Sequence, residues 1–215
     1  MRLIQLSDLQ RPIALVEDAR QKRILNEAGR IPTFQIDEKA ETYADTLFAG
    51  DDQEYIHEIV TRFLEGDANQ AIIMTPLFRP SEGFTRTLIE RGHAHKLAFL
   101  GTRGKGAIPQ TTGGPGLRCY PMNEIMSEGW HDLSDALMHS VRPAESLMLC
   151  VDLMVLDMAY RRTNDMLSAG GMDMRLLLYF VHRLKNMRNL RTIVVTNIEA
   201  CHENVTAKLL YELLG

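Results

Sequence analysis

The sequence predicts an α/β fold with three layers, α/β/α, in which helices cover both faces of a mostly parallel sheet. Short apolar runs of strand length alternate along the chain with longer segments of helical periodicity, the order that parallel strands and crossover helices produce. The segment Ser146–Leu156 is apolar at almost every position, as in a strand buried on both faces. At 215 residues the chain is long enough to bury a core, and we expect residues 1–215 to form a single domain.

The predicted strands are short runs that are rich in apolar or β-branched residues. In chain order they are Arg2–Leu6, Ala71–Met74, Leu97–Leu100, Ser146–Leu156 and Thr192–Val195. No element is assigned to residues 14–28, where charged and apolar residues mix without a clear period.

The predicted helices are segments in which apolar residues recur at helical spacing. They are Gln53–Glu65, the segment from Ser81 to a stop at Gly92, Asn123–His139, Met174–Val181 and Val205–Leu214. Gly66 follows the first helix directly, where we expect a left-handed C-cap. Ser81 is expected to cap the second helix at its amino end.

The composition excludes several classes of partner and compartment. The formal net charge of −4 and the pI near 6.0 give no reason to expect nucleic acid or an anionic membrane. The sequence has no apolar run as long as a membrane helix and no signal-peptide core near Met1, so we expect a cytoplasmic protein. The three cysteines lie far apart, which indicates reduced thiols. Cys150 lies in an apolar run and is interpreted as a core residue.

The candidate site is expected where the predicted parallel strands end, because ligands of α/β sheets bind beyond the carboxyl ends of strands. These ends follow Leu100, Val151 and Val195. Asp152 and Asp157 flank a short apolar segment at the middle one, and an ionised carboxylate there needs a partner. It is either a metal or catalytic ligand, or a side chain that accepts backbone N–H bonds in the next loop. Composition alone favours the second.

The segment Leu149–Asp157 and five further motifs, in the same order over about residues 96–215, resemble the ureohydrolase superfamily of arginases, agmatinases and formimidoylglutamases. Leu149–Asp157 is similar to the pattern S-x-D-x-D-x-x-D-P of that family. The other matches are Phe99–Arg103 to a strand ending in G-x-R, Asn123–Ile125 with Gly129 to the next helix, Ser168–Met172 to a P-x-x-G-G-L turn, Thr192–Asn197 to a strand V-x-x-E-x-N, and Thr206-Ala207 to a T-A pair. The resemblance implies an arginase-like fold. The first 95 residues match no family motif and supply either altered strands or a cover for the sheet.

The resemblance implies a site for two manganese ions, which activate a water for attack on a guanidino or formimino carbon. Of the family's ligands only Asp152 is retained. Met154 stands at the second aspartate, and a thioether is a poor ligand for a hard cation. The motifs G-G-D-H and D-A-H-x-D are absent, and Thr196 replaces a glutamate that binds substrate. We therefore expect no cofactor, or manganese if other residues rebuild the site.

Other candidates for chemistry are weaker. His93 and His95 form a pair of the right type for zinc, but they precede the Leu97 strand at its amino end. Cys201, His202 and Glu203 are neighbours in sequence, and a helix-capping role for this stretch is favoured over catalysis. The Gly-rich loop 101–116 carries Arg103 and Lys105, but it lacks the P-loop pattern and is interpreted as a loop over the site edge. The methionine-rich segment 148–174 is interpreted as core.

Three functions remain open at this stage. The first is a non-catalytic ureohydrolase-like pseudoenzyme that acts in binding or assembly, as a homo-oligomer or with a related active subunit. The second is a hydrolase of a linear amidine or guanidine C–N bond with a rearranged metal site. The third is a small-molecule or nucleotide sensor that uses the Gly-rich loop. The expected binding residues, on the resemblance, are Asp152, Thr196, Asn197 and Arg103; whether the chain is an enzyme is left open.

Overall fold

The computed structural model describes residues 2–5, 36–37, 46–50, 53–79, 83–103, 116–162 and 170–214. The segment 14–28, the predicted cap Ser81 and most of the Gly-rich loop, including Lys105, lie outside the described residues. All structural statements below concern the described part of the chain. None of the described helices is long and apolar enough to cross a membrane.

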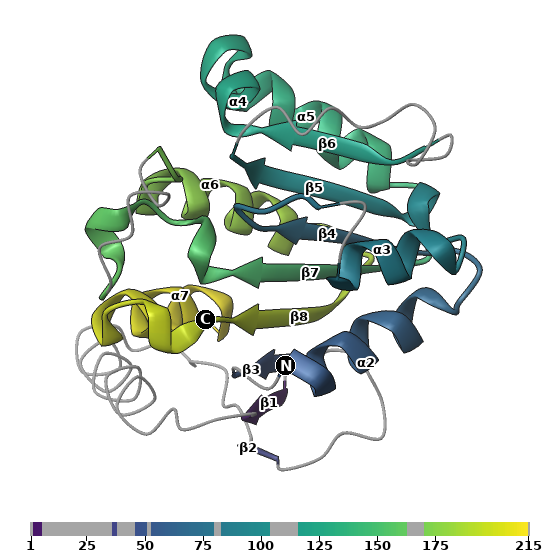
Figure 1. Cartoon of the computed structure of the whole chain (residues 1–215), viewed down its shortest axis with the longest axis horizontal. Helices are drawn as coiled ribbons and strands as arrows, with labels where there is room; N and C mark the ends of the chain where they lie inside the picture. Colours follow the sequence, from purple (N-terminus) through teal and green to yellow (C-terminus); the bar gives the residue numbers. More distant parts are fainter. Residues whose placement is uncertain are drawn as a thin grey trace, which may run out of the picture.

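Eight strands form one sheet in which every pair of neighbours is parallel (Figure 1). The strand order is β2-β1-β3-β8-β7-β4-β5-β6. The strands are β1 (Arg2–Gln5), β2 (Ile36–Asp37), β3 (Thr46–Ala49), β4 (Asn69–Met74), β5 (Leu97–Thr102), β6 (Arg118–Pro121), β7 (Ser146–Asp152) and β8 (Leu190–Thr196). The prediction of a mostly parallel sheet is confirmed. The first 95 residues, which match no family motif, supply the four strands β1 to β4.

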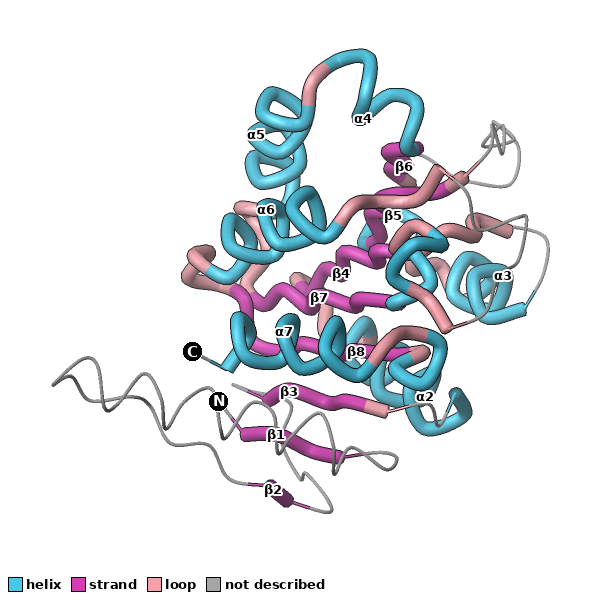
Figure 2. Tube along the Cα trace, turned by 90° about the vertical axis from the view of Figure 1, so that its left-hand side faces the viewer, coloured by secondary structure: helices cyan, strands magenta, loops and turns pink. Residues whose placement is uncertain are grey.

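The helices lie on both sides of the sheet and form the two outer layers. They are α2 (Gln53–Leu64), α3 (Gly83–Glu90), α4 (Met122–Glu128), α5 (Trp130–Val141), α6 (Met174–Lys185) and α7 (Glu203–Leu214). Figure 2 separates α2 and α3 from α5 and α6 on opposite faces, with the sheet between them. The three-layer α/β/α prediction is therefore confirmed.

Side chains of β7 alternate between two apolar cores. Leu147, Leu149 and Val151 belong to the core beneath α5, α6 and α7, whereas Met148 and Cys150 belong to the core beneath α2 and α3. Because successive side chains of a strand point to opposite faces, Asp152 continues the second set. Its carboxylate therefore lies on the face of the sheet that α2 and α3 cover, at the carboxyl end of β7.

Three sequence predictions about elements are wrong in detail. The helix predicted over 123–139 is two helices, α4 and α5, because Gly129 has φ +91 and ψ 128, which is not helical backbone. The strand predicted over 146–156 ends at Asp152, because Leu153–Val155 form a 3₁₀ turn, η2, in which Leu153 and Val155 are buried without being extended.

Gly66 is the third correction, since it does not have the left-handed backbone of a C-cap. The space around it explains the glycine instead. A Cβ at Gly66 would lie 2.4 Å from the amide nitrogen of Asn69, which donates to the carbonyl of Phe63 at the end of α2 (2.7 Å). By contrast, Gly92 after α3 has φ +83 and ends that helix as expected.

Candidate functional site

Asp152, the last residue of β7, ties three segments together through its carboxylate. Its Oδ1 accepts from the backbone N–H of Met154 (2.8 Å) and from the side-chain amide of Asn197 (2.8 Å). Its Oδ2 accepts from the hydroxyl of Thr75 (2.9 Å). Since β4, β7 and β8 are adjacent and parallel, the residues at their carboxyl ends meet at one sheet edge. The carboxylate therefore joins the ends of three strands.

The backbone at Asn197 helps to bring its amide to Asp152. Asn197 follows β8 and has φ 55 and ψ 40, the left-handed conformation, and it is the sole non-glycine residue with positive φ in the described chain. Asparagine adopts this conformation more readily than most residues. The turn of the chain here starts the 3₁₀ segment η5 (Ile198–Ala200) and leaves the amide beside β7.

The electrostatic setting of Asp152 combines opposing effects. Burial raises the pKa of the Asp152 carboxyl above its ordinary value, because the charged form loses solvation. The hydrogen bonds from Asn197, Met154 and Thr75, and then the positive charge of Arg161, act in the opposite direction without cancelling the effect of burial. Burial also lowers the pKa of His57 on α2, so that the neutral imidazole is favoured.

A small pocket of about 160 Å³ lies beside the carboxylate. Its polar part is formed by the ends of the strands, at Thr75, Asp152, Thr196 and Asn197. Its other walls come from α2, α3 and the strand faces beneath them, namely Ile56, His57, Val60, Ile73, Leu77, Phe84, Thr85, Phe99 and Cys150. The rings of His57 and Phe84 are stacked, with centroids 4.0 Å apart. The pocket is thus a mainly apolar cleft with one carboxylate at its end.

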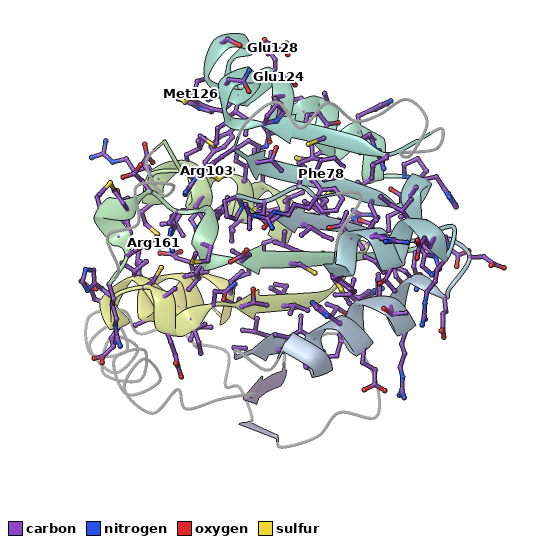
Figure 3. All side chains as sticks on the ribbon, in the orientation of Figure 1. Phe78, Arg103, Glu124, Met126, Glu128 and Arg161 are labelled. Atoms are coloured by element: carbon purple, nitrogen blue, oxygen red, sulfur yellow. The ribbon has the colours of Figure 1, made fainter. Side chains whose placement is uncertain are left out.

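Met154, at the position of the second family aspartate, takes part in a different contact. The guanidinium of Arg161 donates to its sulfur, and the side chain of Arg161 is buried. Figure 3 shows Arg161 near the carboxyl ends of the strands. A buried cation therefore lies next to the residue that replaces a metal ligand, and a divalent cation placed there would be repelled by it.

Asp157 has a capping role in the loop that follows. Its Oδ1 accepts from the N–H of Ala159 (3.2 Å), at the start of the 3₁₀ turn η3 (Met158–Tyr160), and its Oδ2 accepts from the N–H groups of Gly170 (2.9 Å) and Gly171 (3.2 Å). These bonds close the loop that returns to α6. The backbone-accepting interpretation holds for Asp157, and Asp152 combines such a bond with two side-chain bonds.

Arg103 directly follows β5, and its side chain contacts the loop after β7. Its guanidinium donates to the carbonyls of Met154 (3.1 Å) and Leu156 (2.8 Å) and, as Figure 3 shows, lies apart from Phe78. A Cβ at Gly171 would lie 2.4 Å from this guanidinium. These contacts position the loop, whereas the predicted role of Arg103 in binding stays a prediction.

The weaker candidates lie away from the pocket. His93 precedes η1 (Ala94–Lys96) and His95 lies within it, before β5 at the amino edge of the sheet, as expected. Glu203 starts α7 and pairs with Arg162 (2.9 Å), while Cys201 is buried and donates to the carbonyl of Leu153. Burial raises the pKa of the Cys150 thiol to about 12, so that it is protonated at neutral pH. The core interpretation of Cys150 is confirmed.

The side chains around Asp152 do not supply the ligands that the two manganese ions implied by the resemblance would need. Manganese prefers several oxygen ligands, with carboxylates to balance its charge. In the described residues no three His, Cys, Asp or Glu side chains lie together in a way that holds a metal ion. The single carboxylate present already accepts three hydrogen bonds, and its neighbour Met154 contacts a guanidinium.

Sequence reasoning missed three residues of this site. Thr75 directly follows the predicted strand Ala71–Met74, and a hydroxyl that follows a buried strand and precedes Pro76 is a signal of a strand-end site. His57 and Arg161 carry no such signal. Their roles depend on α2 packing over β4 and on the loop after β7 folding back.

Comparisons with known proteins give matches of structure alone. No family model and no curated protein matches the chain. Formimidoylglutamase from Bacillus subtilis subsp. subtilis str. 168 aligns with a TM-score of 0.72 at 15% identity, over 99% of this chain and 85% of that one. Arginase from Bacillus subtilis aligns with a TM-score of 0.70 at 13% identity, over 100% and 98%.

A third solved structure, proclavaminate amidino hydrolase from Streptomyces clavuligerus, aligns with a TM-score of 0.61 at 18% identity. The match covers 80% of this chain, which spans 64% of that protein's length. At such identities the likeness concerns the arrangement of the backbone and not the chemistry of the site. The chain has an arginase-like α/β fold.

Proposed function

We propose that this chain is a non-catalytic, ureohydrolase-like binding protein, in which the pocket beside Asp152 takes a ligand without a di-manganese centre. One observation carries the proposal: the carboxylate of Asp152 is held by donors from three strand ends. A carboxylate that ligates two metals needs its lone pairs for them. Here internal hydrogen bonds use three of those positions.

The proposal treats residues 1–215 as one domain, with Asp152, Thr196 and Asn197 as binding residues and Arg103 supporting their loop. Thr196 and Asn197 line the pocket next to Asp152. We also propose, from the likeness of the fold to arginases alone, that the chain forms a homo-oligomer or joins a related active subunit in the cytoplasm. Light scattering after size-exclusion chromatography measures the mass of the protein, alone and mixed with a related active subunit. A monomeric mass in both measurements would contradict the proposed assembly.

Metal titration and an activity assay test the loss of catalysis. The protein is freed of metal with a chelator and titrated with Mn²⁺ in a calorimeter, and it is then assayed for hydrolysis of guanidino and formimino compounds. We expect no tight binding of two ions per chain and no turnover. Two tightly bound manganese ions, together with turnover that disappears in Asp152→Asn, would contradict the proposal.

A matched variant separates real turnover from a contaminant. Asp157 lies on the same loop but caps backbone N–H groups, so Asp157→Asn leaves the pocket carboxylate in place. Weak activity that persists equally in both variants comes from another protein. Weak activity that is lost only in Asp152→Asn belongs to this chain and favours a hydrolase with a rearranged site.

A further inference from the structure

We propose that the pocket beside Asp152 binds a small primary ammonium ion with a short unbranched alkyl chain. The inference rests on the proposed function, since it takes the site to be free of a metal centre. It names the class of ligand that the lone carboxylate, the neighbouring oxygens and the apolar walls recognise together. The pocket joins these three features at one end of β4, β7 and β8.

The polar end of the pocket is rich in acceptors. Oδ2 of Asp152 has one hydrogen bond, from Thr75, and an ionised carboxylate oxygen can accept a second. Thr196 and Asn197 also line the pocket, and each carries a side-chain oxygen that can accept. The amide nitrogen of Asn197 is already used on Asp152, which leaves its amide oxygen. An ammonium group has three N–H donors and no acceptor, so its donors match these three oxygens.

A guanidinium fits this carboxylate poorly. Its strong mode of binding is a fork, in which two parallel N–H groups reach both oxygens of one carboxylate. Oδ1 of Asp152 is already taken by two donors, Met154 and Asn197, so the fork cannot close on both oxygens. An ammonium is a compact point charge that needs only one of them. The internal hydrogen bonds therefore favour an amine over a guanidine.

The charge and size of the pocket restrict the class of ligand further. Asp152 is the one lining residue with a formal charge, since burial of His57 favours its neutral form, and the guanidinium of Arg161 is directed at Met154. A volume of about 160 Å³ equals about five waters at roughly 30 Å³ each. The side walls at Ile56, Val60 and Phe99 are apolar, which suits a chain of CH₂ groups.

Calorimetry with three ligands of five heavy atoms tests the inference in metal-free buffer. They are n-butylammonium, methylguanidinium and n-butanol; the first and third share the butyl chain and differ only in head group, whereas methylguanidinium matches them in number of heavy atoms. We expect the wild-type chain to bind n-butylammonium at least about tenfold more tightly than either of the others, because each 1.4 kcal/mol is a factor of ten. Equal or tighter binding of methylguanidinium overturns the inference, as does equal binding of n-butanol.

Variants assign the binding to the pocket. Asp152→Asn keeps the shape but removes the charge, and we expect at least about a tenfold loss of affinity for n-butylammonium. Thr196→Val removes one acceptor at constant volume, and we expect a loss of about threefold to tenfold. Asp157→Asn, with its carboxylate outside the pocket, should bind as the wild type does. Unchanged affinity in both pocket variants, with folding verified by thermal melts, overturns the assignment.

The two proposals fail in different ways. Absence of ammonium binding by a chain that also binds no manganese removes this inference and leaves the non-catalytic function standing. Tight binding of two manganese ions with turnover removes the proposed function, whatever the affinity for amines.

Discussion

Asp152 and Asp157 lie five positions apart, at the two ends of one apolar segment, and the fold uses them differently. Asp152 ends a central strand, and its carboxylate joins side chains that follow β4 and β8. Asp157 lies beyond η2, and its carboxylate accepts only from backbone N–H groups. The one borders a pocket, whereas the other closes a turn. Position in the sheet, and not residue type, decides which carboxylate is available for a ligand.

Gly171 packs closely against the end of the loop between these aspartates, and the largest expected effect is at this glycine. In Gly171→Ala a Cβ would meet the guanidinium of Arg103 at 2.4 Å and backbone atoms of Leu156 and Asp157 at 2.7 Å. Backbone cannot move as a flexible side chain does, so we expect a loss of about 3 kcal/mol in the free energy of unfolding. Urea denaturation measures it.

Gly170 is the matched control for that variant. It has φ +79, and no atom of the described residues lies within 4 Å of an added Cβ, so we expect Gly170→Ala to add backbone strain without a clash against them. We expect a cost of about 1 kcal/mol. If Gly170→Ala proves as costly as Gly171→Ala, strain and not packing governs this turn.

Removal of the Asp152 side chain is the next largest effect. Asp152→Ala leaves the N–H of Met154, the amide of Asn197 and the hydroxyl of Thr75 without their acceptor, and we expect a loss of about 2 kcal/mol in stability. Asp152→Asn keeps an acceptor oxygen and should lose less. A loss as large in Asp152→Asn as in Asp152→Ala would show that the charge, and not the hydrogen bonds, stabilises the strand ends.

The pH dependence of the free energy of unfolding shows whether ionisation of Asp152 stabilises or destabilises the native state. The pKa of Asp152 is raised above 3.8 by burial, so between pH 3.8 and the higher folded value the native state binds more protons than the unfolded state. Stability then falls as pH rises through that window. We expect the free energy of unfolding of the wild type, relative to Asp152→Asn, to decrease as pH rises above 3.8. An increase contradicts this assignment.

The capping role of Asp157 predicts a smaller loss. Asp157→Ala removes the acceptor for three backbone N–H groups, but the side chain is partly exposed and water can replace some of these bonds. We expect a loss of about 1 kcal/mol, with ammonium binding unchanged. A loss of binding in this variant would mean that the two aspartates form one site.

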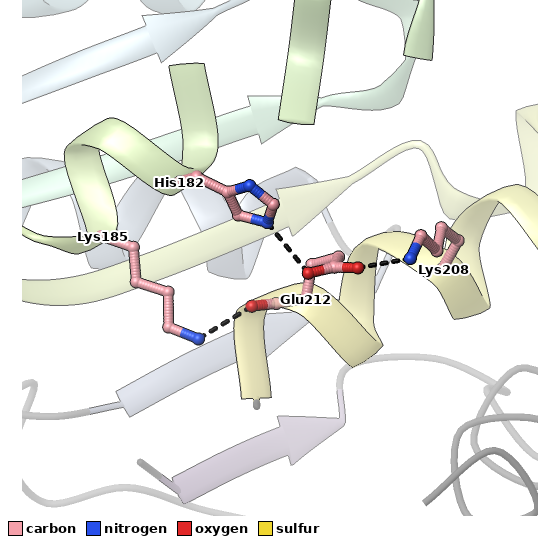
Figure 4. A network of polar contacts seen from close by, with 4 residues as sticks. All are labelled: His182, Lys185, Lys208 and Glu212. Carbon is pink, nitrogen blue, oxygen red and sulfur yellow. Dashed lines mark hydrogen bonds and ion pairs between the residues drawn. The ribbon is translucent and has the colours of Figure 1, made fainter. Parts of the chain in front are cut away.

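A carboxylate far from both shows the scale of a surface interaction. Glu212 on α7 accepts from His182 on α6 (2.9 Å) and from Lys208, while Lys185 donates to its carbonyl (Figure 4). Partial burial raises the pKa of Glu212, but the bonds from Lys208 and His182 outweigh it, and the pKa lies below 4.5. Its contribution is therefore present above pH 4.5 and lost as pH falls through the folded pKa.

Glu212→Gln should cost less than about 0.5 kcal/mol at neutral pH. The difference from the wild type should vanish in strong acid, which denaturation at several pH values measures. A difference that grows in acid would reverse the sign given above.

The fold was predictable because its signals are local. The alternation of short apolar runs with helical periodicity identifies β4, β5 and β8, the start of β7, and the helices α2, α6 and α7 close to their observed bounds. Two of the three errors concern glycines, because a glycine in the sequence can serve either of two purposes. Gly129 breaks a helix by its backbone angles, whereas Gly66 admits the side chain of Asn69, and sequence alone cannot separate these uses.

The sequence by itself determined the parallel α/β architecture and the absence of the family's metal motifs, since both are written in residue types at short spacing. It also directed attention to Asp152. Only the tertiary structure brought Thr75 and Asn197 to that carboxylate, across 77 and 45 positions, and placed Arg161 against Met154. The reason is physical: a strand end acquires its partners from neighbouring strands, and their order in the sheet differs from their order in the chain.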